Sequence, residues 1–424
     1  MVRRNVSWMM ADKVVRLVVG LALNVWMVRY LGASALGLLG FAQSVVSILA
    51  ILSQLGLETI LVRELVRRPQ EERALLGSAL ALRLGGAVLT LVLAVTAIAG
   101  LRPGDADALA LAVVFGSAVV AQSFDVIELW FQSRSRVVPF VVARAGAFAV
   151  ASGVRVAALV AHASLPVLAL AIAVEVFLGA VALVVALRLQ GDAPRGWRAE
   201  RATARQLFFE SWPLMINGAA VLFVIRIDQT MLTLMRGVHE NGIYAAAQRL
   251  TEVVFFIPLA VASAAAPTLL RSHARDRAEY EHRLERVLTL LAWSAIAIAL
   301  PVSLLANWLT VALFGSAFRD SGPVLALHIW STPGLFMGAA ITNWFIAEGR
   351  QGELMLRSVL GAALNVALNL GLIPAFGARG AALAALVSLT LAYVFANALF
   401  PSTRPLFRLQ MRALLPLRAR SERR

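Results

Sequence analysis

The chain has 424 residues, of which 60% are hydrophobic and 15% are charged, so it is predicted to be an integral membrane protein rather than a soluble domain. It contains no cysteine, which excludes disulfides and cysteine-based metal sites. A net charge of +15 would suggest a nucleic-acid partner in a soluble chain. Here the arginines lie in alternate connections between apolar stretches, as in membrane proteins, so no nucleic-acid partner is expected.

Twelve apolar stretches are long enough to cross a hydrocarbon core of about 30 Å as helices, which predicts an all-α membrane protein. Arginine is common in one alternating set of connections and rare in the other. By the positive-inside rule, this asymmetry predicts that both termini are cytoplasmic. In chain order, the predicted spans are 11–30, 36–57, 74–100, 107–131, 137–161, 165–188, 206–235, 240–268, 285–312, 322–346, 352–374 and 378–400.

These spans divide into two six-helix halves, predicted at residues 1–190 and 206–400. A basic cytoplasmic linker, 191–205, joins them. A basic cytoplasmic tail, 401–424, follows the second half and is expected to lie on the anionic inner leaflet or to act only as a topology signal. Six spans per half give both halves the same orientation, which predicts a parallel pseudo-two-fold arrangement around a central cavity.

Two sequence echoes indicate that the halves are a duplicated unit. In each echo, three residues recur at one constant offset. At an offset of 205, they are Gly32, Gly37 and Gln43 with Gly237, Gly242 and Gln248. At an offset of 214, they are Trp130, Phe131 and Arg136 with Trp344, Phe345 and Arg350.

Arginines inside the predicted spans are the candidate binding residues. A charge at the bilayer centre costs roughly 2.5–3.5 kcal/mol, and arginine keeps its proton in proteins, so these side chains should face a wet interior. A cavity lined by guanidinium groups would attract a diphosphate and bind it with forked donors. The alternative is that each arginine pairs with an acid or reaches an interface. The arginines assigned to this cavity are Arg83, Arg144, Arg155, Arg226, Arg16 and Arg249.

Four acids inside the spans are candidates for ion coupling or for structural pairing with arginine: Asp125, Glu128, Asp228 and Glu175. Asp125 and Glu128 share one helix face and could hold a proton, or they could neutralise Arg144 or Arg83. Asp228 is expected to be the structural partner of an arginine on another helix. No catalytic residue, metal site or cofactor is expected, apart from a coupling ion, H⁺ or Na⁺.

Short motifs occur in a fixed order along the chain. They are Gly32 with Gly37; Arg226-Ile227-Asp228 with Gly237, Gly242, Tyr244 and Gln248-Arg249; Leu313-Phe314-Gly315 with Phe318; and Leu364-Asn365, Leu368-Asn369, Ile373-Pro374, Phe376-Gly377 and Gly380-Ala381-Ala382. Together they resemble the polysaccharide-unit (O-antigen-type) flippases of the multidrug/oligosaccharidyl-lipid/polysaccharide exporter superfamily. The resemblance implies a transporter of the bacterial inner membrane. It would flip a polyprenyl-diphosphate-linked oligosaccharide to the outer leaflet by alternating access, for synthesis of cell-surface polysaccharide.

Two other classes of function are weighed against this one. An ion-coupled multidrug exporter of the same superfamily would need an anionic or aromatic cavity, because a cationic cavity repels its substrates. A membrane glycan polymerase or ligase is the remote alternative, since no enzyme motif is present and the predicted outer loops are short. The expected partners are the lipid-linked substrate, membrane lipids, and a polysaccharide polymerase or glycosyltransferases, and the protein is expected to act as a monomer.

Overall fold

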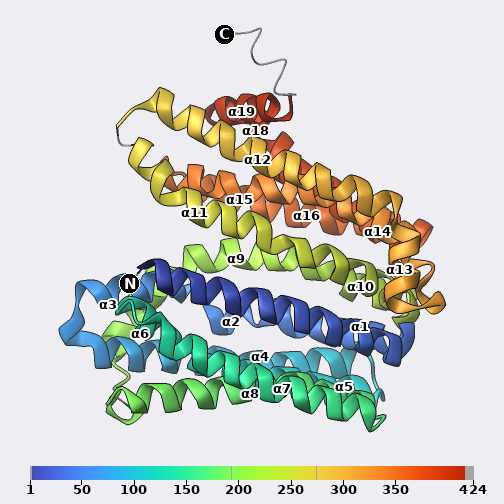
Figure 1. Cartoon of the computed structure of the whole chain (residues 1–424), viewed down its shortest axis with the longest axis horizontal. Helices are drawn as coiled ribbons and strands as arrows, with labels where there is room; N and C mark the ends of the chain where they lie inside the picture. The colour runs from blue at the N-terminus through green and yellow to red at the C-terminus, as the bar shows by residue number, and fades with distance from the viewer. Residues whose placement is uncertain (1, 192, 274, 416–424) are drawn as a thin grey trace. The chain divides into compact units, whose positions relative to one another are not determined.

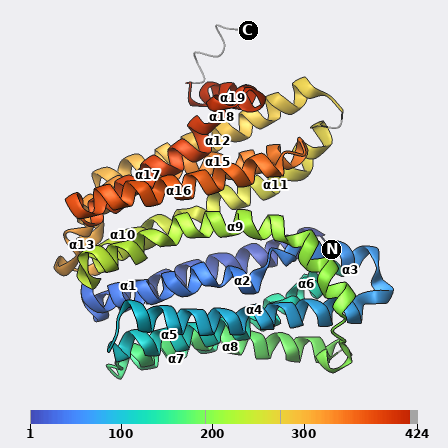
Figure 2. The same ribbon diagram turned by 180° about the vertical axis from the view of Figure 1, so that it is seen from behind.

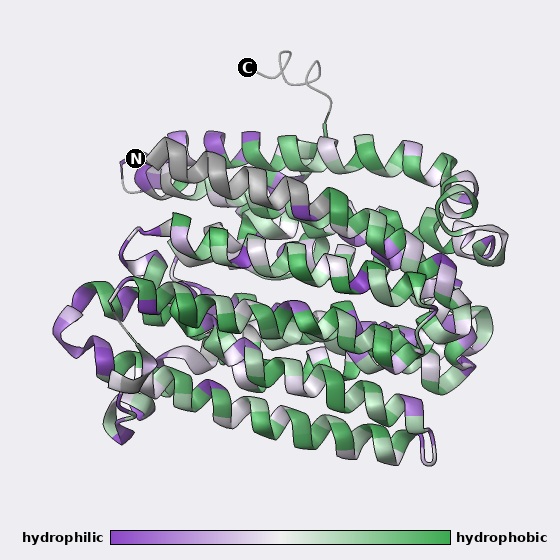
Figure 3. Cartoon of the chain, turned by 60° about the horizontal axis from the view of Figure 1, so that its bottom comes forward, coloured by the Kyte–Doolittle hydropathy of each residue, from purple (hydrophilic) through white to green (hydrophobic). Residues whose placement is uncertain are grey.

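The computed structural model describes residues 2–191, 193–273 and 275–415. Every regular element in this part of the chain is a helix (Figure 1). The helices form two compact units, Met1–Leu222 (unit 1) and Phe223–Arg424 (unit 2). Apolar residues run along the lengths of the helices, and hydrophilic residues gather toward the connections between them (Figure 3). The all-helical membrane fold is therefore confirmed.

In unit 1, the long helices pack side by side. α7 lies along α8 and α1, and α5 lies along α4 and α8 (Figure 2). α9 begins in unit 1 and ends in unit 2. The helices are α1 (Val2–Leu49), α2 (Ile51–Gln54), α3 (Leu57–Arg67), α4 (Glu72–Leu101), α5 (Ala106–Gln122), α6 (Val126–Ser133), α7 (Val137–Val160), α8 (Leu165–Leu189) and α9 (Arg201–Arg236).

In unit 2, α12 packs against α11, α15 and α19, and α16 packs along α17. A π-helical turn, Leu391–Phe395, joins α17 to α18. The helices are α10 (Val238–Glu252), α11 (Phe256–His273), α12 (Arg277–Leu304), α13 (Ala306–Phe314), α14 (Ser321–His328), α15 (Thr332–Ala347), α16 (Gln351–Phe376), α17 (Ala378–Thr390), α18 (Ala396–Leu399) and α19 (Arg404–Leu414).

Eleven helical segments of the described chain are long and apolar enough to cross a membrane, one fewer than predicted. The difference lies in the first segment, Val18–Arg67, whose 50 residues far exceed the roughly 20 that one crossing needs. Gly32 interrupts it with φ 68° and ψ 177°, so the predicted spans 11–30 and 36–57 lie on either side of this kink. The predicted span 285–312 is also too long, because α12 ends at Leu304 and α13 is a separate helix.

The two sequence echoes have matching local structures. Gly237, between α9 and α10, has φ 90° and ψ 173°, close to the conformation of Gly32. Each Trp–Phe pair is edge-on, with ring centroids 4.9 Å apart in unit 1 and 5.1 Å apart in unit 2, and lies in the core of its unit. Five residues beyond each phenylalanine, the backbone N–H of an arginine donates to the backbone carbonyl of the phenylalanine, at 2.9 Å for Arg136 and 2.8 Å for Arg350.

The predicted linker packs on unit 1. The backbone N–H of Arg198 donates to the carbonyl of Arg73 at 3.1 Å, and that of Glu200 donates to Ser78 Oγ at 3.0 Å. A Cβ on Gly77 would lie 2.4 Å from the Arg198 carbonyl oxygen, so the missing side chain lets the linker lie directly on α4. The division between the compact units falls inside α9, after Leu222. The boundaries of the repeat itself stay a prediction.

The tail forms a helix that is part of the unit 2 core. α19 buries Leu406, Leu409 and Ala413 against residues of α12 and α15. Its Gln410 donates to the Tyr393 carbonyl at 2.9 Å and accepts from Asn397 at 2.7 Å. The apolar face of α19 is thus covered by protein, whereas Arg404, Arg408 and Arg412 are exposed. That the tail lies on the inner leaflet stays a prediction. Residues 416–424 lie outside the described part of the chain.

Candidate functional site

Unit 2 contains a buried carboxylate, Asp228 of α9, that is 1% exposed. Tyr244 Oη donates to Oδ2 at 2.8 Å, and Asn369 Nδ2 donates to Oδ1 at 2.6 Å. The prediction that Asp228 pairs with an arginine is therefore wrong: within the described residues, its hydrogen-bond partners are neutral. Arg226 lies two residues away and so projects from a different face of the helix, where it meets another acid.

Two asparagines extend this network from α16 to α17. Asn365 and Asn369 lie one turn apart, so both amides project from one face of α16. Asn369 Nδ2 donates to Asn365 Oδ1 at 3.1 Å, and Asn365 Nδ2 donates to Ser388 Oγ at 3.2 Å. The asparagine pair thus bonds across helices, linking α9, α16 and α17. Ser388 was missed because nothing in its own sequence context marks it as a partner.

One buried oxygen beside Asp228 has no hydrogen-bond donor among the described residues: Asn369 Oδ1, in the amide whose Nδ2 binds the carboxylate. Gln229 Oε1 and Thr233 Oγ1 are also unpartnered. They project from other faces of α9 than Asp228 does, roughly 100° and 140° around the helix. A carboxylate with neutral oxygens nearby is the environment that hard cations prefer. Within the described residues, no group of three or more His, Cys, Asp or Glu side chains could hold a metal ion.

A second cluster in unit 2 contains Glu252 of α10 between two arginines. Arg226 Nη1 lies 3.1 Å from Glu252 Oε1, and both side chains are 29% exposed. Gln248 Nε2 donates to the same carboxylate oxygen at 3.1 Å. Arg249 lies close enough for its charge to interact with both Glu252 and Arg226. Arg226 therefore forms an ion pair with Glu252, and the charge of Arg249 lies near both.

Unit 1 contains a similar cluster around Glu175 of α8. Arg155 Nη2 lies 2.5 Å from Glu175 Oε2, and Arg16 Nη1 lies 3.6 Å from Oε1. The Arg16 guanidinium also lies over the Phe148 ring, 5.1 Å from its centroid. The three charged side chains are 17–29% exposed. As in unit 2, a single glutamate lies between two arginines.

The remaining predicted residues form a balanced group in unit 1. Arg144 forms an ion pair with Asp125, and its Nη2 lies 3.4 Å from Glu128 Oε2. Arg83 of α4 is 3% exposed, and its nearest carboxylate is Glu58, at 3.9 Å. Its Nε and Nη1 have no acceptor among the described residues. Asp125 and Glu128 thus neutralise Arg144, which was the structural alternative weighed for these acids.

Among the described residues, the six predicted arginines therefore fall into three groups. Two groups lie around Glu175 and Glu252, and the third contains Arg83 and Arg144. That all six line a single cavity stays a prediction.

The all-helical membrane fold and the charged clusters inside its spans place this protein in the class of multi-pass membrane transporters. The sequence profile of a family described as "Polysaccharide biosynthesis protein" matches residues 2–273, well over half of the chain. The chain belongs to this family, which confirms the resemblance drawn from its motifs.

Solved structures share the fold at low sequence identity. A multidrug resistance MATE family transporter of the MOP superfamily, in its inward-facing conformation, is 15% identical, with a TM-score of 0.73 over 94% of this chain and 95% of that one. The lipid II flippase MurJ, in an inward closed conformation, is 12% identical, with a TM-score of 0.67 over 96% and 91%. A MOP superfamily transporter from Pyrococcus furiosus is 16% identical, with a TM-score of 0.65 over 97% and 95%. No curated protein has a significantly similar sequence.

Proposed function

We propose that this protein flips a polyprenyl-diphosphate-linked oligosaccharide from the cytoplasmic to the outer leaflet of the bacterial inner membrane. It would act by alternating access, as a monomer with both termini cytoplasmic, and as a transporter rather than an enzyme. Membership of the polysaccharide biosynthesis family supports a substrate that carries a glycan. The glycosyltransferases that make the substrate and the polymerase that consumes it are the proposed protein partners.

The observation that carries this proposal is the recurrence of one glutamate between two arginines, around Glu175 in unit 1 and Glu252 in unit 2. Each cluster places arginines inside apolar spans, where a charged side chain is costly unless it meets an anion or water. A diphosphate is such an anion, and it fits the forked donors of arginine. A cationic drug would be repelled, which disfavours the multidrug exporter.

Substitutions of Arg226 and Arg155 by Gln test this proposal. Each variant keeps hydrogen-bonding capacity but loses the positive charge, so we expect normal abundance with reduced flipping, measured as accumulation of the lipid-linked oligosaccharide in cells. Lys should restore transport only in part, because it lacks the planar fork. Arg102→Gln is the matched control, since Arg102 pairs with Asp105 in a connection outside the predicted spans. Full transport by both Gln variants at normal abundance would contradict the proposal.

A double-mutant cycle separates binding from structural pairing. If Arg226 only balances Glu252, then Arg226→Gln should lower abundance, because an unpaired charge is left in the membrane. In that case, adding Glu252→Gln should restore abundance and transport together. If Arg226 binds substrate, the double variant should remain defective in transport.

The environment of Asp228 supports coupling to H⁺ or Na⁺ bound at that carboxylate. Burial among neutral partners favours neutralisation of a carboxylate by a proton or a cation. The unpartnered Asn369 Oδ1 would be a further oxygen ligand for a cation at Asp228. Neither ion would take part in any chemical step.

Thermal unfolding of the purified full-length protein distinguishes the two ions. Stabilisation of the wild type by NaCl but not KCl, absent in Asp228→Asn, would indicate Na⁺. Equal behaviour in both salts, with flipping that follows a pH gradient in the wild type but not in Asp228→Asn, would indicate H⁺. Gradient-dependent flipping by Asp228→Asn at the wild-type rate would rule out coupling through this residue.

A further inference from the structure

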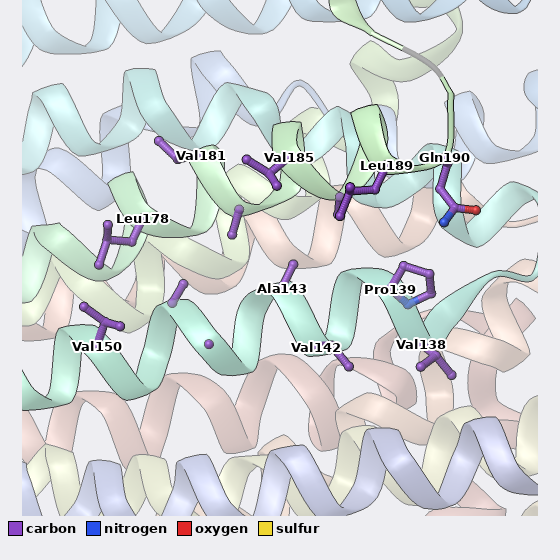
Figure 4. Close-up of a pocket in the computed structure, with 14 residues that line it drawn as sticks. Val138, Pro139, Val142, Ala143, Val150, Leu178, Val181, Val185, Leu189 and Gln190 are labelled. Atoms are coloured by element: carbon purple, nitrogen blue, oxygen red, sulfur yellow. The ribbon is translucent and has the colours of Figure 1, made fainter.

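An apolar groove of about 620 Å³ lies between α7 and α8 of unit 1 (Figure 4). Small residues line its length: Ala143, Gly146 and Ala147 on α7, and Ala182 and Ala186 on α8. Ala147 and Ala186 are buried, so the groove has a packed floor rather than an opening through the unit. Its volume is within the range of ligand-binding pockets, about 300–1,000 Å³.

Branched side chains border this floor. Val142, Val150, Val181 and Val185 line the groove, and 48–61% of the surface of each is exposed. The groove is therefore open along the helices rather than enclosed. Such a shape suits a linear apolar chain that enters sideways from the hydrocarbon, where burial of each methylene group still improves packing against protein.

One end of the groove is basic. Gln190 is the one polar side chain that lines it, and it lies with Pro139 at one end, whereas Val150 and Leu178 lie at the other (Figure 4). Arg136 Nη1 donates to Gln190 Oε1 at 3.0 Å, and Arg188 is in the last turn of α8.

Neither Arg136 nor Arg188 forms an ion pair with a carboxylate of the described residues. The neighbouring Arg134 differs, because it is held by Glu72 at 2.6 Å. The groove thus pairs a long apolar slot with two exposed cations at one end. An anionic lipid has the same distribution of charge, with a phosphate at one end of a hydrocarbon chain.

We infer that this groove binds the isoprenoid chain of a polyprenyl phosphate lipid, with the phosphate at Arg136 and Arg188. The inference rests on the proposed function and locates the tail of its substrate. A polyprenyl lipid carries one hydrocarbon chain, which matches one slot between two helices. A phospholipid carries two, and its second chain would stay outside. Holding the chain in the groove also keeps it out of water during transport.

Gly146 offers a direct way to block the groove. A Cβ at Gly146 would meet nothing within 4 Å, so the side chain of Gly146→Leu has room to start from the backbone and would occupy the slot. Gly153→Leu is the matched control: it lies on the same helix, also meets nothing within 4 Å, and does not line the groove. A leucine side chain in the slot would occupy the space of the bound chain and remove its packing contacts, so we expect binding to weaken at least about tenfold, or about 1.4 kcal/mol.

The experiment is native mass spectrometry of the purified full-length protein in detergent, titrated with C55 polyprenyl phosphate. We expect one bound lipid on the wild type and on Gly153→Leu, and at least about tenfold weaker binding to Gly146→Leu. C55 polyprenol, which lacks phosphate, should bind more weakly than the phosphate, and Arg136→Gln with Arg188→Gln should remove that difference. Equal binding to both leucine variants, or displacement by equimolar phosphatidylglycerol, would overturn the inference.

Failure here is distinguishable from failure of the proposed function. Cells that lack the protein should accumulate lipid-linked oligosaccharide whether or not the tail occupies this groove. If they do accumulate it while Gly146→Leu binds the probe normally, the flippase proposal stands and the groove inference falls. If no glycan accumulates but Gly146→Leu loses the probe, the groove binds a polyprenyl lipid and the transport proposal falls.

Discussion

At the scale of single residues, the charges in this protein are separated by helix geometry. Arg226 and Asp228 are neighbours in sequence, yet Arg226 meets Glu252 and Asp228 meets Tyr244 and Asn369. The arginine is partly exposed and the aspartate is buried, so one suits a diffusing anion and the other a small ion. The two roles proposed for these residues follow from that difference in access.

Backbone conformation provides the first prediction. Gly32 and Gly237 occupy a region of φ and ψ that is essentially restricted to glycine, and a Cβ at either would meet nothing within 4 Å. Gly32→Ala and Gly237→Ala should therefore each lower the free energy of unfolding by roughly 1–3 kcal/mol through backbone strain alone. Gly20→Ala, in the helical part of α1 and equally free of contacts, should be neutral or slightly stabilising.

Thermal unfolding in detergent measures all three variants. Unfolding of Gly32→Ala at the same temperature as Gly20→Ala would show that the kink in α1 does not require glycine.

At the scale of elements, α3 and the start of α9 are joined by charge and close packing. Arg63 of α3 forms an ion pair with Glu210 of α9, and a Cβ on Gly56 would lie 2.8 Å from the Met215 backbone nitrogen. α9 begins at Arg201, and its candidate membrane span, Leu214–Arg236, follows Glu210. The first turns of α9 make a polar contact with α3 within unit 1.

Glu210 makes this contact sensitive to pH. A hydrogen bond from Gln206, at 2.8 Å, together with the charges of Arg63 and Arg68, lowers the pKa of Glu210 below its ordinary value. Because the folded-state pKa is the lower one, Glu210 stabilises the fold above the unfolded pKa of about 4.3 and loses that effect as pH falls through the folded pKa.

Unfolding temperatures of the wild type and Glu210→Gln, compared across this pH range, test the effect. The wild type should be the more stable near neutral pH, and the two should converge in acid. Gln206→Ala keeps the Glu210 carboxylate but removes the hydrogen bond that lowers its pKa most. In that background, Glu210→Gln should therefore change the unfolding temperature less. A gap between wild type and Glu210→Gln that persists unchanged in acid would contradict this account.

At the scale of the whole molecule, the two compact units each have a core built around a Trp–Phe pair. The same pair is followed in both units by the same backbone hydrogen bond, as a duplicated helical unit would require. Each unit also contains a glutamate with arginines beside it, Glu175 in unit 1 and Glu252 in unit 2. These likenesses in backbone, core and charge are what a duplication predicts.

Membrane topology is the prediction at this scale, and the cysteine-free chain suits a labelling test. Asp107 and Ala202 are both exposed. From the arginine asymmetry, a cysteine at position 107 should react with a membrane-impermeant thiol reagent in spheroplasts, and one at position 202 should react only after lysis. The reverse pattern would invert the predicted orientation and place the proposed substrate on the wrong side.

Local sequence determined much of this protein. Spans follow from runs of apolar residues and connections from arginine, because transfer of each side chain into hydrocarbon depends mainly on that side chain. The glycine echo was visible in the sequence because a backbone conformation that only glycine adopts requires glycine at that position. The Trp–Phe echo was visible as the same residue pair at a constant offset. These signals were sufficient for the fold class and the family.

Only the tertiary structure decided which groups meet. The partners of Asp228, Glu175 and Glu252 come from other helices, and sequence does not state which helices pack together. The burial of α19 in the unit 2 core is hidden for the same reason, because an amphipathic helix looks alike whether protein or lipid covers it. The groove between α7 and α8 depends on two runs of small residues facing each other, a contact that neither run specifies alone.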